Sequence, residues 1–458
     1  MKLFKKAFTA ILMPILFLFM SINSYGQRSD RAITDIEKKQ IIDTALALLK
    51  ANYIFPEKLT VMEERIYKKF STGEYSKFTV MEDFIKHINA DLENFTNDRH
   101  VNLFHDPVRV KQIVAEAKGD NNKPGYAPEF LQRAKFENYM IRKVERLDGN
   151  IGYLKFNIFV DTFLSKKTLV AAMGFIANSS ALIIDLRQNG GGDSHTCSFL
   201  LGYFLPDSTL ISQRRSRSNN SLSKGYINHV SSLQKFSQDV PVYILVSKRT
   251  SSAAEAFAYT LQASRRAVII GDTTKGEANP GYLYALNKEM YIMIPAFESI
   301  NPITKTNWQA KGVIPDIKIS ADKALIMAQS KLYEKLATTS SNEDLKNMYS
   351  WMAIGLLAEV QPINIKDSEL KSFAGDYSDD RHISFSNGSL FYYKGDNEKN
   401  KKKLIPLGSD LFGVEAVPFF SLRFIKSEKG QITSLEGMYD DGKKEVSSKL
   451  AMPTPSGL

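Results

Sequence analysis

The first third of the chain has its hydrophobic positions at helix spacing. Apolar side chains follow this period around residues 36–49 and again at residues 80–92, so the pattern predicts that residues 33–105 are helical. The next stretch, residues 106–128, is polar and contains glycine and proline, which predicts a linker or a flexible flap. A short helix is predicted at residues 130–136.

From residue 150 onward, short apolar runs alternate with helical patterns. The predicted strands lie at residues 151–156, 181–186, 241–247 and 267–271, and the predicted helices at residues 163–177, 197–204 and 253–265. Apolar strands separated by helices are typical of an α/β layer with a largely buried sheet. Residues 281–296 are predicted to form a hairpin that extends this sheet.

The last part of the chain changes from helical to β patterning. Helices are predicted at residues 321–336 and 342–359, and a hairpin with an Asn-Gly turn at Asn387 and Gly388. Further strands are predicted at residues 412–417, 422–425 and 434–439. The predicted organisation is a signal peptide at 1–26, a helical N-terminal domain at 27–128, an α/β core at 129–325, a helical connector at 326–360 and a small all-β domain at 361–458.

The N-terminus has the pattern of a secretory signal. Three lysines precede the apolar run at residues 7–20, and small and polar residues follow up to Gly26, so we expect cleavage near Gln27 and export to the periplasm or the extracellular space. The alternative is a short membrane anchor, but the run is short for a bilayer span. After cleavage we expect no stable membrane insertion.

Composition excludes some classes of partner and cross-link. The single cysteine, Cys197, permits no intramolecular disulfide. The formal net charge of +10 is only mildly basic, and the lysine run at residues 394–403 is more typical of a solvated hairpin tip than of a nucleic-acid surface. We therefore expect no nucleic-acid partner.

Two segments carry residues suited to acyl-transfer chemistry. Ser252 stands where a predicted strand turns into a predicted helix, so its hydroxyl would lie at a helix N-terminus, where negative charge is favoured. The glycines after the strand at residues 181–186 let backbone N–H groups approach a substrate. Ser252 is therefore a candidate nucleophile, and Ala253, Gly190 and Gly191 are candidate oxyanion donors.

Four motifs in order resemble one protease family. They are DLRQNGGG, TSSAAEAFAY, RRAVIIGDTTKG and GVIPDIKI, and they resemble the core of the tail-specific (C-terminal processing) serine peptidases. The branch without a PDZ domain is the most similar, with the tricorn core and the repeats of interphotoreceptor retinoid-binding protein. The upstream segments ANYIFPEKL, FTNDRHVNLF and GNIGYLKFNIF also fit. The resemblance implies a ClpP/crotonase-like mixed sheet with helices, and neither a metal nor an organic cofactor.

The resemblance also bears on the general base. The familiar tail-specific enzymes use a lysine, but Glu277 occupies that position here and Lys275 is two residues away, so a serine–lysine dyad is disfavoured. The tricorn-like branch uses a histidine in a segment that matches NDRHVNLF, which implies His100 as the base. His195, which follows the glycines, is a candidate for lining the cleft. His87, His229 and His382 are interpreted as surface or packing residues. His105 lies five residues from His100, and this spacing without a third ligand is poor evidence for a metal site.

Two departures from the tricorn pattern affect the orientation of this base. Gln309 stands where the resemblance places an orienting glutamate, and Arg99 stands where it places a serine. A glutamine can hold a hydrogen bond but cannot stabilise an imidazolium by charge. If Gln309 is the orienting residue, restoring the carboxylate with Gln309→Glu should raise turnover. Glu255 is predicted to cap the helix that follows Ser252.

The predicted function is that of an exported serine peptidase, which cleaves proteins or peptides through an acyl-enzyme on Ser252. The alternatives on the same fold are a non-catalytic carrier of apolar ligands and an envelope protein with an inactive site, which Gln309 and Arg99 would favour. The sequence names no substrate and no oligomeric state.

Overall fold

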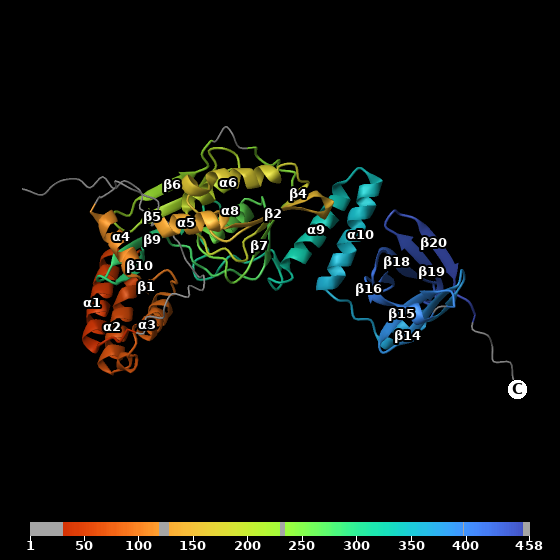
Figure 1. Cartoon of the computed structure of the whole chain (residues 1–458), viewed down its shortest axis with the longest axis horizontal. Helices are drawn as coiled ribbons and strands as arrows, with labels where there is room; N and C mark the ends of the chain where they lie inside the picture. The colour runs from red at the N-terminus through yellow and green to blue at the C-terminus, as the bar shows by residue number, and fades with distance from the viewer. Residues whose placement is uncertain (1–30, 119–127, 230–233, 397, 452–458) are drawn as a thin grey trace, which may run out of the picture. The chain divides into compact units, whose positions relative to one another are not determined.

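The chain divides into two compact units, Met1–Ala321 and Asp322–Leu458 (Figure 1). The structure, a computed structural model, describes residues 31–118, 128–229, 234–396 and 398–451. The predicted signal peptide lies outside these residues. Within them, no helix has the length and the apolar composition that a membrane crossing requires.

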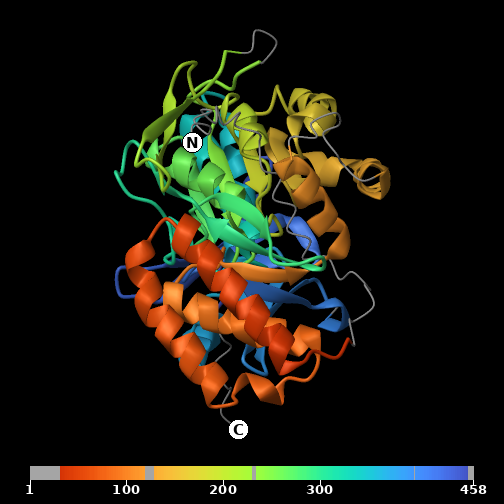
Figure 2. The ribbon, with the colours of Figure 1, turned by 90° about the vertical axis from the view of Figure 1, so that its left-hand side faces the viewer.

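The first unit begins with three packed helices, which lie side by side in red and orange in Figure 2. They are α1 (Asp35–Asn52), α2 (Leu59–Ser71) and α3 (Met81–Thr96). The first of them starts at a capping box, in which Glu37 N donates to the Thr34 hydroxyl and Thr34 N donates to the Glu37 carboxylate. The helical N-terminal domain is therefore confirmed over residues 35–96.

The prediction of helix up to residue 105 is wrong at its end. The helix α3 stops at Asn97, which has a left-handed backbone (φ 52°), and β1 (Asn102–His105) follows as a strand. It pairs with β10 (Met290–Pro295), which pairs with β9 (Gly281–Ala285). This hairpin was predicted to extend the core sheet, but its apolar side chains pack against the three helices instead.

A second difference lies in the predicted linker. Pro107–Ala117 form helix α4, because the Asp106 carboxylate accepts hydrogen bonds from Val108 N (3.0 Å) and Arg109 N (2.9 Å) and Pro107 starts the first turn. The rest of that predicted linker, residues 119–127, lies outside the described residues. The short helix expected next is confirmed as α5 (Pro128–Phe136).

The core is a six-stranded sheet in the order β12-β8-β7-β4-β3-β2. All its neighbouring strands pair in parallel except β2 at one edge, which is antiparallel. The strands are β2 (Ile141–Leu147), β3 (Ile151–Phe156), β4 (Ala181–Asp185), β7 (Val242–Val246), β8 (Val268–Gly271) and β12 (Ile317–Lys318), and the core helices are α6 (Thr162–Phe175), α7 (Ser194–Leu201) and α8 (Ala253–Ala263). The predicted α/β alternation is therefore confirmed.

A small antiparallel sheet beside this core was not predicted. Its order is β11-β5-β6, with bounds Phe297–Ile300, Leu210–Ser216 and Leu222–Tyr226. The strand β6 is mostly exposed, so it lacks the apolar alternation by which a strand is recognised in a sequence.

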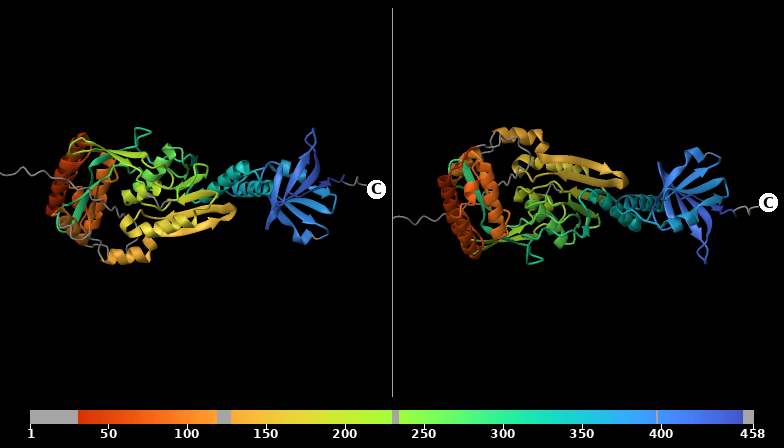
Figure 3. Two further views of the ribbon diagram at one scale, coloured as in Figure 1. Left: turned by 90° about the horizontal axis from the view of Figure 1, so that it is seen from above. Right: turned by 90° about the horizontal axis from the view of Figure 1, so that it is seen from below.

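The second unit contains a helical pair and a β-barrel. The helices α9 (Ala324–Thr339) and α10 (Glu343–Val360) run side by side, as the teal segments of Figure 3 show. A hydrogen bond from Leu450 N to Asp376 O (2.8 Å) joins the two ends of an eight-stranded antiparallel sheet, which closes it. Its elements are α11 (Asp367–Phe373), β13 (Gly375–Tyr377), β14 (Arg381–Ser386), β15 (Ser389–Lys394), β16 (Lys402–Pro406), β17 (Leu411–Val414), β18 (Val417–Lys426), β19 (Ile432–Tyr439) and β20 (Lys444–Ser448). The small all-β domain is confirmed.

Candidate active site

Ser252 occupies the sharp turn between β7 and α8. It is the N-cap of α8 and has φ 53° and ψ −118°, a conformation that costs a non-glycine residue about 1–3 kcal/mol and that is typical of functional turns. Two hydrogen bonds hold the turn, from Ser252 N to the Glu255 carboxylate (2.8 Å) and from Ser251 N to Asn189 O (3.2 Å). The half-buried hydroxyl of Ser252 is therefore fixed at the helix N-terminus.

The glycine loop lies directly against this turn. A Cβ atom on Gly191 (φ 100°) would come within 2.8 Å of the Ser252 Cβ, so only glycine fits there. The N–H of Gly190 donates to Asn157 O (3.1 Å), and that of Gly191 donates to the Asn189 side chain (2.9 Å). In the described part of the chain, the N–H of Ala253 donates to no residue. Of the three candidate oxyanion donors, Ala253 is thus the one that needs no rearrangement.

His100 comes from the helical domain and is 1% exposed. Its backbone N–H donates to the Asp98 carboxylate (3.1 Å), and its Nδ1 lies 4.0 Å from the same oxygen, too far for a hydrogen bond. The Tyr53 hydroxyl donates to the other carboxylate oxygen (3.3 Å). Burial raises the pKa of Asp98, and the nearby His100 only partly offsets this effect. Asp98 therefore fixes the backbone that carries the imidazole.

Glu277 joins the nucleophile loop to the base. Its carboxylate is buried, accepts a hydrogen bond from the Ser251 hydroxyl and pairs with the Lys275 ammonium (2.6 Å). Burial acts to raise the pKa of this carboxyl, but the electrostatic influence of His100 and Lys275 and these hydrogen bonds outweigh it, so its pKa lies below the usual value. The sequence analysis placed Glu277 only as the residue that replaces a lysine. The available signal was that an acidic residue stands at the position where the resemblance places a catalytic lysine.

A second buried carboxylate, Glu255, connects the same elements. It accepts hydrogen bonds from Ser252 N (2.8 Å), Thr274 Oγ1 (2.5 Å), Gly276 N (2.6 Å) and Glu277 N (2.9 Å). Burial raises its pKa to about 7, and the charge of Glu277 adds to the increase. The predicted cap at the start of α8 is confirmed, and it also holds the loop that carries Glu277.

Gln309 and Arg99 tie the helical domain to this loop. The Gln309 side chain accepts a hydrogen bond from Ala278 N (2.9 Å) and donates one to Asn97 O (3.3 Å). The Arg99 guanidinium donates to Lys275 O (2.9 Å). These contacts place the segment before His100 against the residues on both sides of Glu277.

The other candidates have structural partners. Arg187 and Asp185 form a buried ion pair (2.7 Å) at the end of β4. His195 is exposed and lines a pocket next to the glycine loop. The described residues contain no cluster of three or more His, Cys, Asp or Glu side chains that could hold a metal ion. The remaining histidines contact neighbouring side chains: His87 stacks on Phe78, His105 lies near Glu289, His229 pairs with Asp207 and His382 pairs with Asp376.

Comparison with known proteins finds similarity to C-terminal processing proteases. The chain is similar to the carboxy-terminal-processing protease of Bartonella bacilliformis (26% identity over 180 residues, 38% of this chain and 40% of the relative). It is also similar to carboxyl-terminal-processing peptidase 1 of Arabidopsis thaliana (25% over 183 residues, 40% of this chain and 36% of the relative). The chain thus matches less than half the length of these two relatives.

Among solved structures, the tricorn protease aligns with 62% of this chain and 34% of its own, with a TM-score of 0.40 and 13% identity. The sequence profile of peptidase family S41 matches residues 150–319. The profile of the N-terminal domain of peptidase S41 in eukaryotic IRBP matches residues 33–148. Together the two profiles cover the helical domain and the α/β core, so this chain belongs to peptidase family S41.

Proposed function

We propose that the protein is a serine-type peptidase that cleaves proteins or peptides through an acyl-enzyme on Ser252. One observation carries the proposal: the buried Glu277 carboxylate accepts a hydrogen bond from the Ser251 hydroxyl and also lies within electrostatic range of His100. The nucleophile turn and the histidine, which come from different domains, therefore meet at one charged group. Such a meeting of perturbed groups is typical of catalytic sites.

In the proposed reaction, His100 removes the proton of the Ser252 hydroxyl as its oxygen attacks the peptide carbonyl carbon. The N–H of Ala253 stabilises the oxyanion, and the N–H of Gly191 joins it once the Asn189 side chain releases that group. The C–N bond then breaks, and the imidazolium returns the proton to the leaving amine. Water, activated by His100, hydrolyses the ester and restores the serine.

Glu277 is proposed as the positioning residue for His100. Its lowered pKa keeps it charged at neutral pH, so it stabilises the imidazolium that forms as the serine proton is transferred. Gln309, whose side chain bridges Asn97 and Ala278, is proposed to hold the two segments together through neutral hydrogen bonds. In this proposal, Glu277 supplies the negative charge that Gln309 lacks.

The test is covalent labelling with a serine-reactive fluorophosphonate, followed by peptide mapping. Wild type should be labelled on Ser252, and Ser252→Ala and His100→Ala should lose labelling by at least ~10⁴-fold. Ser251→Ala is the matched control, since it removes the neighbouring hydroxyl and should still be labelled on Ser252. Lys275→Ala should also retain labelling. A label on Ser251, or loss of labelling in Lys275→Ala alone, contradicts the proposal.

The carrier alternative makes a different prediction for the same sample. A protein that only carries apolar ligands would bind a fluorescent fatty acid and leave the fluorophosphonate unreacted. The pocket that His195 lines carries three cationic side chains and several hydroxyl groups, which suits an apolar ligand poorly. Labelling of wild type that depends on both Ser252 and His100 would exclude the carrier.

We also propose that the protein is exported with cleavage near Gln27, on the basis of the lysines and the apolar run at residues 7–20. N-terminal sequencing of the protein from the exported fraction tests this proposal. A start near Gln27 supports it, and an intact Met1 contradicts it.

A further inference from the structure

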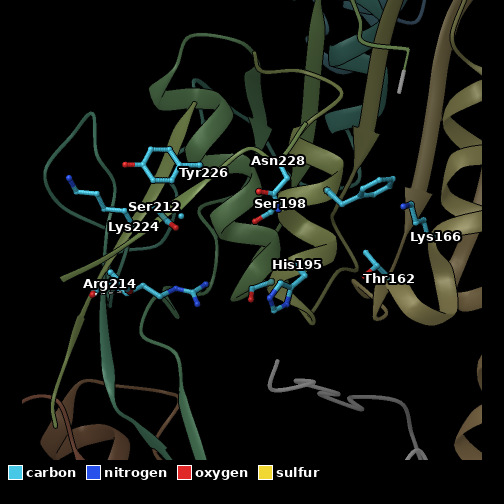
Figure 4. Close-up of a pocket in the computed structure, with 13 residues that line it drawn as sticks. Thr162, Lys166, His195, Ser198, Ser212, Arg214, Lys224, Tyr226 and Asn228 are labelled. Atoms are coloured by element: carbon cyan, nitrogen blue, oxygen red, sulfur yellow. Dashed lines mark hydrogen bonds between the residues drawn. The ribbon is translucent and has the colours of Figure 1, made fainter. Parts of the chain in front are cut away.

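A pocket of about 610 Å³ opens between α6, α7 and the strands β5 and β6 (Figure 4). Its lining includes the cations Lys166, Arg214 and Lys224, the imidazole of His195 and several hydroxyl groups, and it includes no aspartate or glutamate. A pocket of this composition attracts an anion, because no acidic residue in the pocket lining neutralises its cationic side chains.

Arg214 is the cation that faces the inside of this pocket. Its guanidinium and the His195 ring point toward one another across the pocket, whereas Lys224 directs its ammonium away (Figure 4). Within the described part of the chain, the Arg214 guanidinium donates no hydrogen bond and forms no ion pair within 4.0 Å. Burial acts to lower the pKa of Arg214. A guanidinium held in this way is stabilised when an incoming carboxylate supplies paired acceptors.

The carboxylates nearest to Arg214 are already engaged. Asp193 is buried and caps α7 through Thr196 N (2.7 Å) and Thr196 Oγ1 (2.9 Å), and its other carboxylate oxygen lies 3.5 Å from His195 Nδ1. Its charge partly offsets the effect of burial on Arg214. Glu298 pairs with Arg215, the next residue of β5 (2.8 Å). Because successive strand residues face opposite sides of a sheet, Arg215 and Glu298 lie on the face away from Arg214.

Helix α7 connects the pocket to the nucleophile turn. The helix α7, which supplies Ser194 and His195 to the pocket, starts directly after the glycine loop that contacts Ser252. Its Cys197 thiol donates to Ala253 O (3.5 Å), and Arg214 acts electrostatically on the same thiol. A peptide whose carbonyl is held at Ala253 N–H therefore has the pocket within reach of a neighbouring side chain.

We propose that this pocket is a substrate subsite that binds a carboxylate group of the peptide, through Arg214 with Lys166 and His195 as further donors. The proposal rests on the peptidase function and adds its specificity. The carboxylate has two possible sources, an acidic side chain close to the cleaved bond or the free C-terminus of the substrate.

The experiment compares three peptides of a common sequence in two pairs. The first pair is an Asp/Glu peptide and its Asn/Gln isostere, both with an amidated C-terminus. The second pair is the Asn/Gln peptide with a free and with an amidated C-terminus. Catalytic efficiency is measured with wild type, and equilibrium binding with Ser252→Ala. We expect a preference of about tenfold or more for one carboxylate peptide over its neutral partner, because a hydrogen bond to a charged group contributes free energy of this size. The first pair tests the side chain and the second pair tests the C-terminus.

Variants locate the preference. Arg214→Gln should reduce the ratio of carboxylate to neutral peptide toward one, Arg214→Lys should restore part of it, and the exposed Lys166→Gln should reduce it less. Arg215→Gln and Lys167→Gln, whose positions lie next to these residues but outside the pocket lining, are the matched controls and should keep the wild-type ratio. If Arg214→Gln does not fold, the ratio of carboxylate to neutral peptide is compared between Lys166→Gln and Lys167→Gln, and a lower ratio in Lys166→Gln supports the subsite.

The outcomes separate the two proposals. Equal catalytic efficiency of wild type on all three peptides with equal affinity of Ser252→Ala for them, or a preference that survives in Arg214→Gln and Lys166→Gln, overturns the carboxylate subsite. Absence of fluorophosphonate labelling overturns the peptidase function, while binding by Ser252→Ala still reports on the pocket.

Discussion

The nucleophile turn and the base segment reach the same site by opposite routes. Ser252 is held by residues that follow it in the chain and by the adjoining glycine loop, and its turn lies between a strand and a helix that are both buried. The segment that carries His100 is also held by contacts from another domain, since Arg99 donates a hydrogen bond to a residue 176 positions away and Gln309 donates one to Asn97 O across 212 positions. Changes in the inter-domain contacts should therefore affect the base more than the nucleophile.

The two buried glutamates show the same contrast in their electrostatics. Glu255 faces backbone N–H groups and another carboxylate, and burial with that repulsion raises its pKa to about 7. For Glu277, the electrostatic influence of His100 and Lys275 and the hydrogen bonds from Lys275 and Ser251 outweigh the effect of burial, so its pKa is lowered. Equal burial thus gives opposite shifts, because the neighbouring charges decide the sign. We infer that Glu255 clamps the loop and that Glu277 acts on the base.

The largest expected effect comes from neutralising the charge beside the base. Glu277→Gln keeps the shape of the side chain but removes its charge, so single-turnover acylation should fall by up to ~10⁴-fold, as for an orienting acid in a triad. Asp98→Asn is the matched control and should cost less, because Asp98 contacts the backbone of His100. A larger loss in Asp98→Asn would transfer the charged role to Asp98.

The next effect concerns stability against pH. Because the Glu255 pKa is raised from 4.5 to about 7, its contribution is fully present below pH 4.5 and is lost as the pH rises through 7. The loss is on the order of 3 kcal/mol. Glu277, with a lowered pKa, contributes above pH 4.5 and loses its contribution only in more acidic solution. Urea unfolding between pH 5 and 8 should show a shallower decline in Glu255→Gln than in wild type, and equal slopes would contradict this assignment.

A smaller effect is expected at Gln309, where the structure reverses the expectation from the sequence. A carboxylate at this position cannot donate to Asn97 O, which the amide does now. Gln309→Glu should therefore lower acylation about tenfold, measured as single turnovers across pH 6–9, and Gln309→Ala should lower it to a similar extent. A rise in Gln309→Glu would instead support Gln309 as the residue that orients His100.

The smallest effect is expected at Arg99. Arg99→Ala removes one hydrogen bond to Lys275 O, which is worth about 1 kcal/mol, and the catalytic efficiency should fall roughly fivefold. Arg65→Ala, elsewhere in the helical domain, is the control. If Arg99→Ala equals wild type, this contact does not help to position the base.

Much of the fold followed from local patterns, and the failures have a common cause. The strands and helices between residues 151 and 271 are apolar and regular, so their periodicity was sufficient. The helix α4 depends on the Asp106 cap, which lay inside a stretch that polar composition marked as a linker. The strand β1 exists because β10 pairs with it, and a four-residue strand carries too little pattern of its own.

The sequence by itself determined the elements around Ser252, the glycine loop and the family resemblance, because each is set by residues close together in the chain. Only the tertiary structure decided that Glu277 lies within electrostatic range of His100, that Gln309 bridges Asn97 and Ala278, and that Arg214 lines a pocket whose wall contains no acidic residue. The physical reason is that charge and hydrogen bonding act over a few ångströms in space, and packing between distant segments chooses which groups come that close.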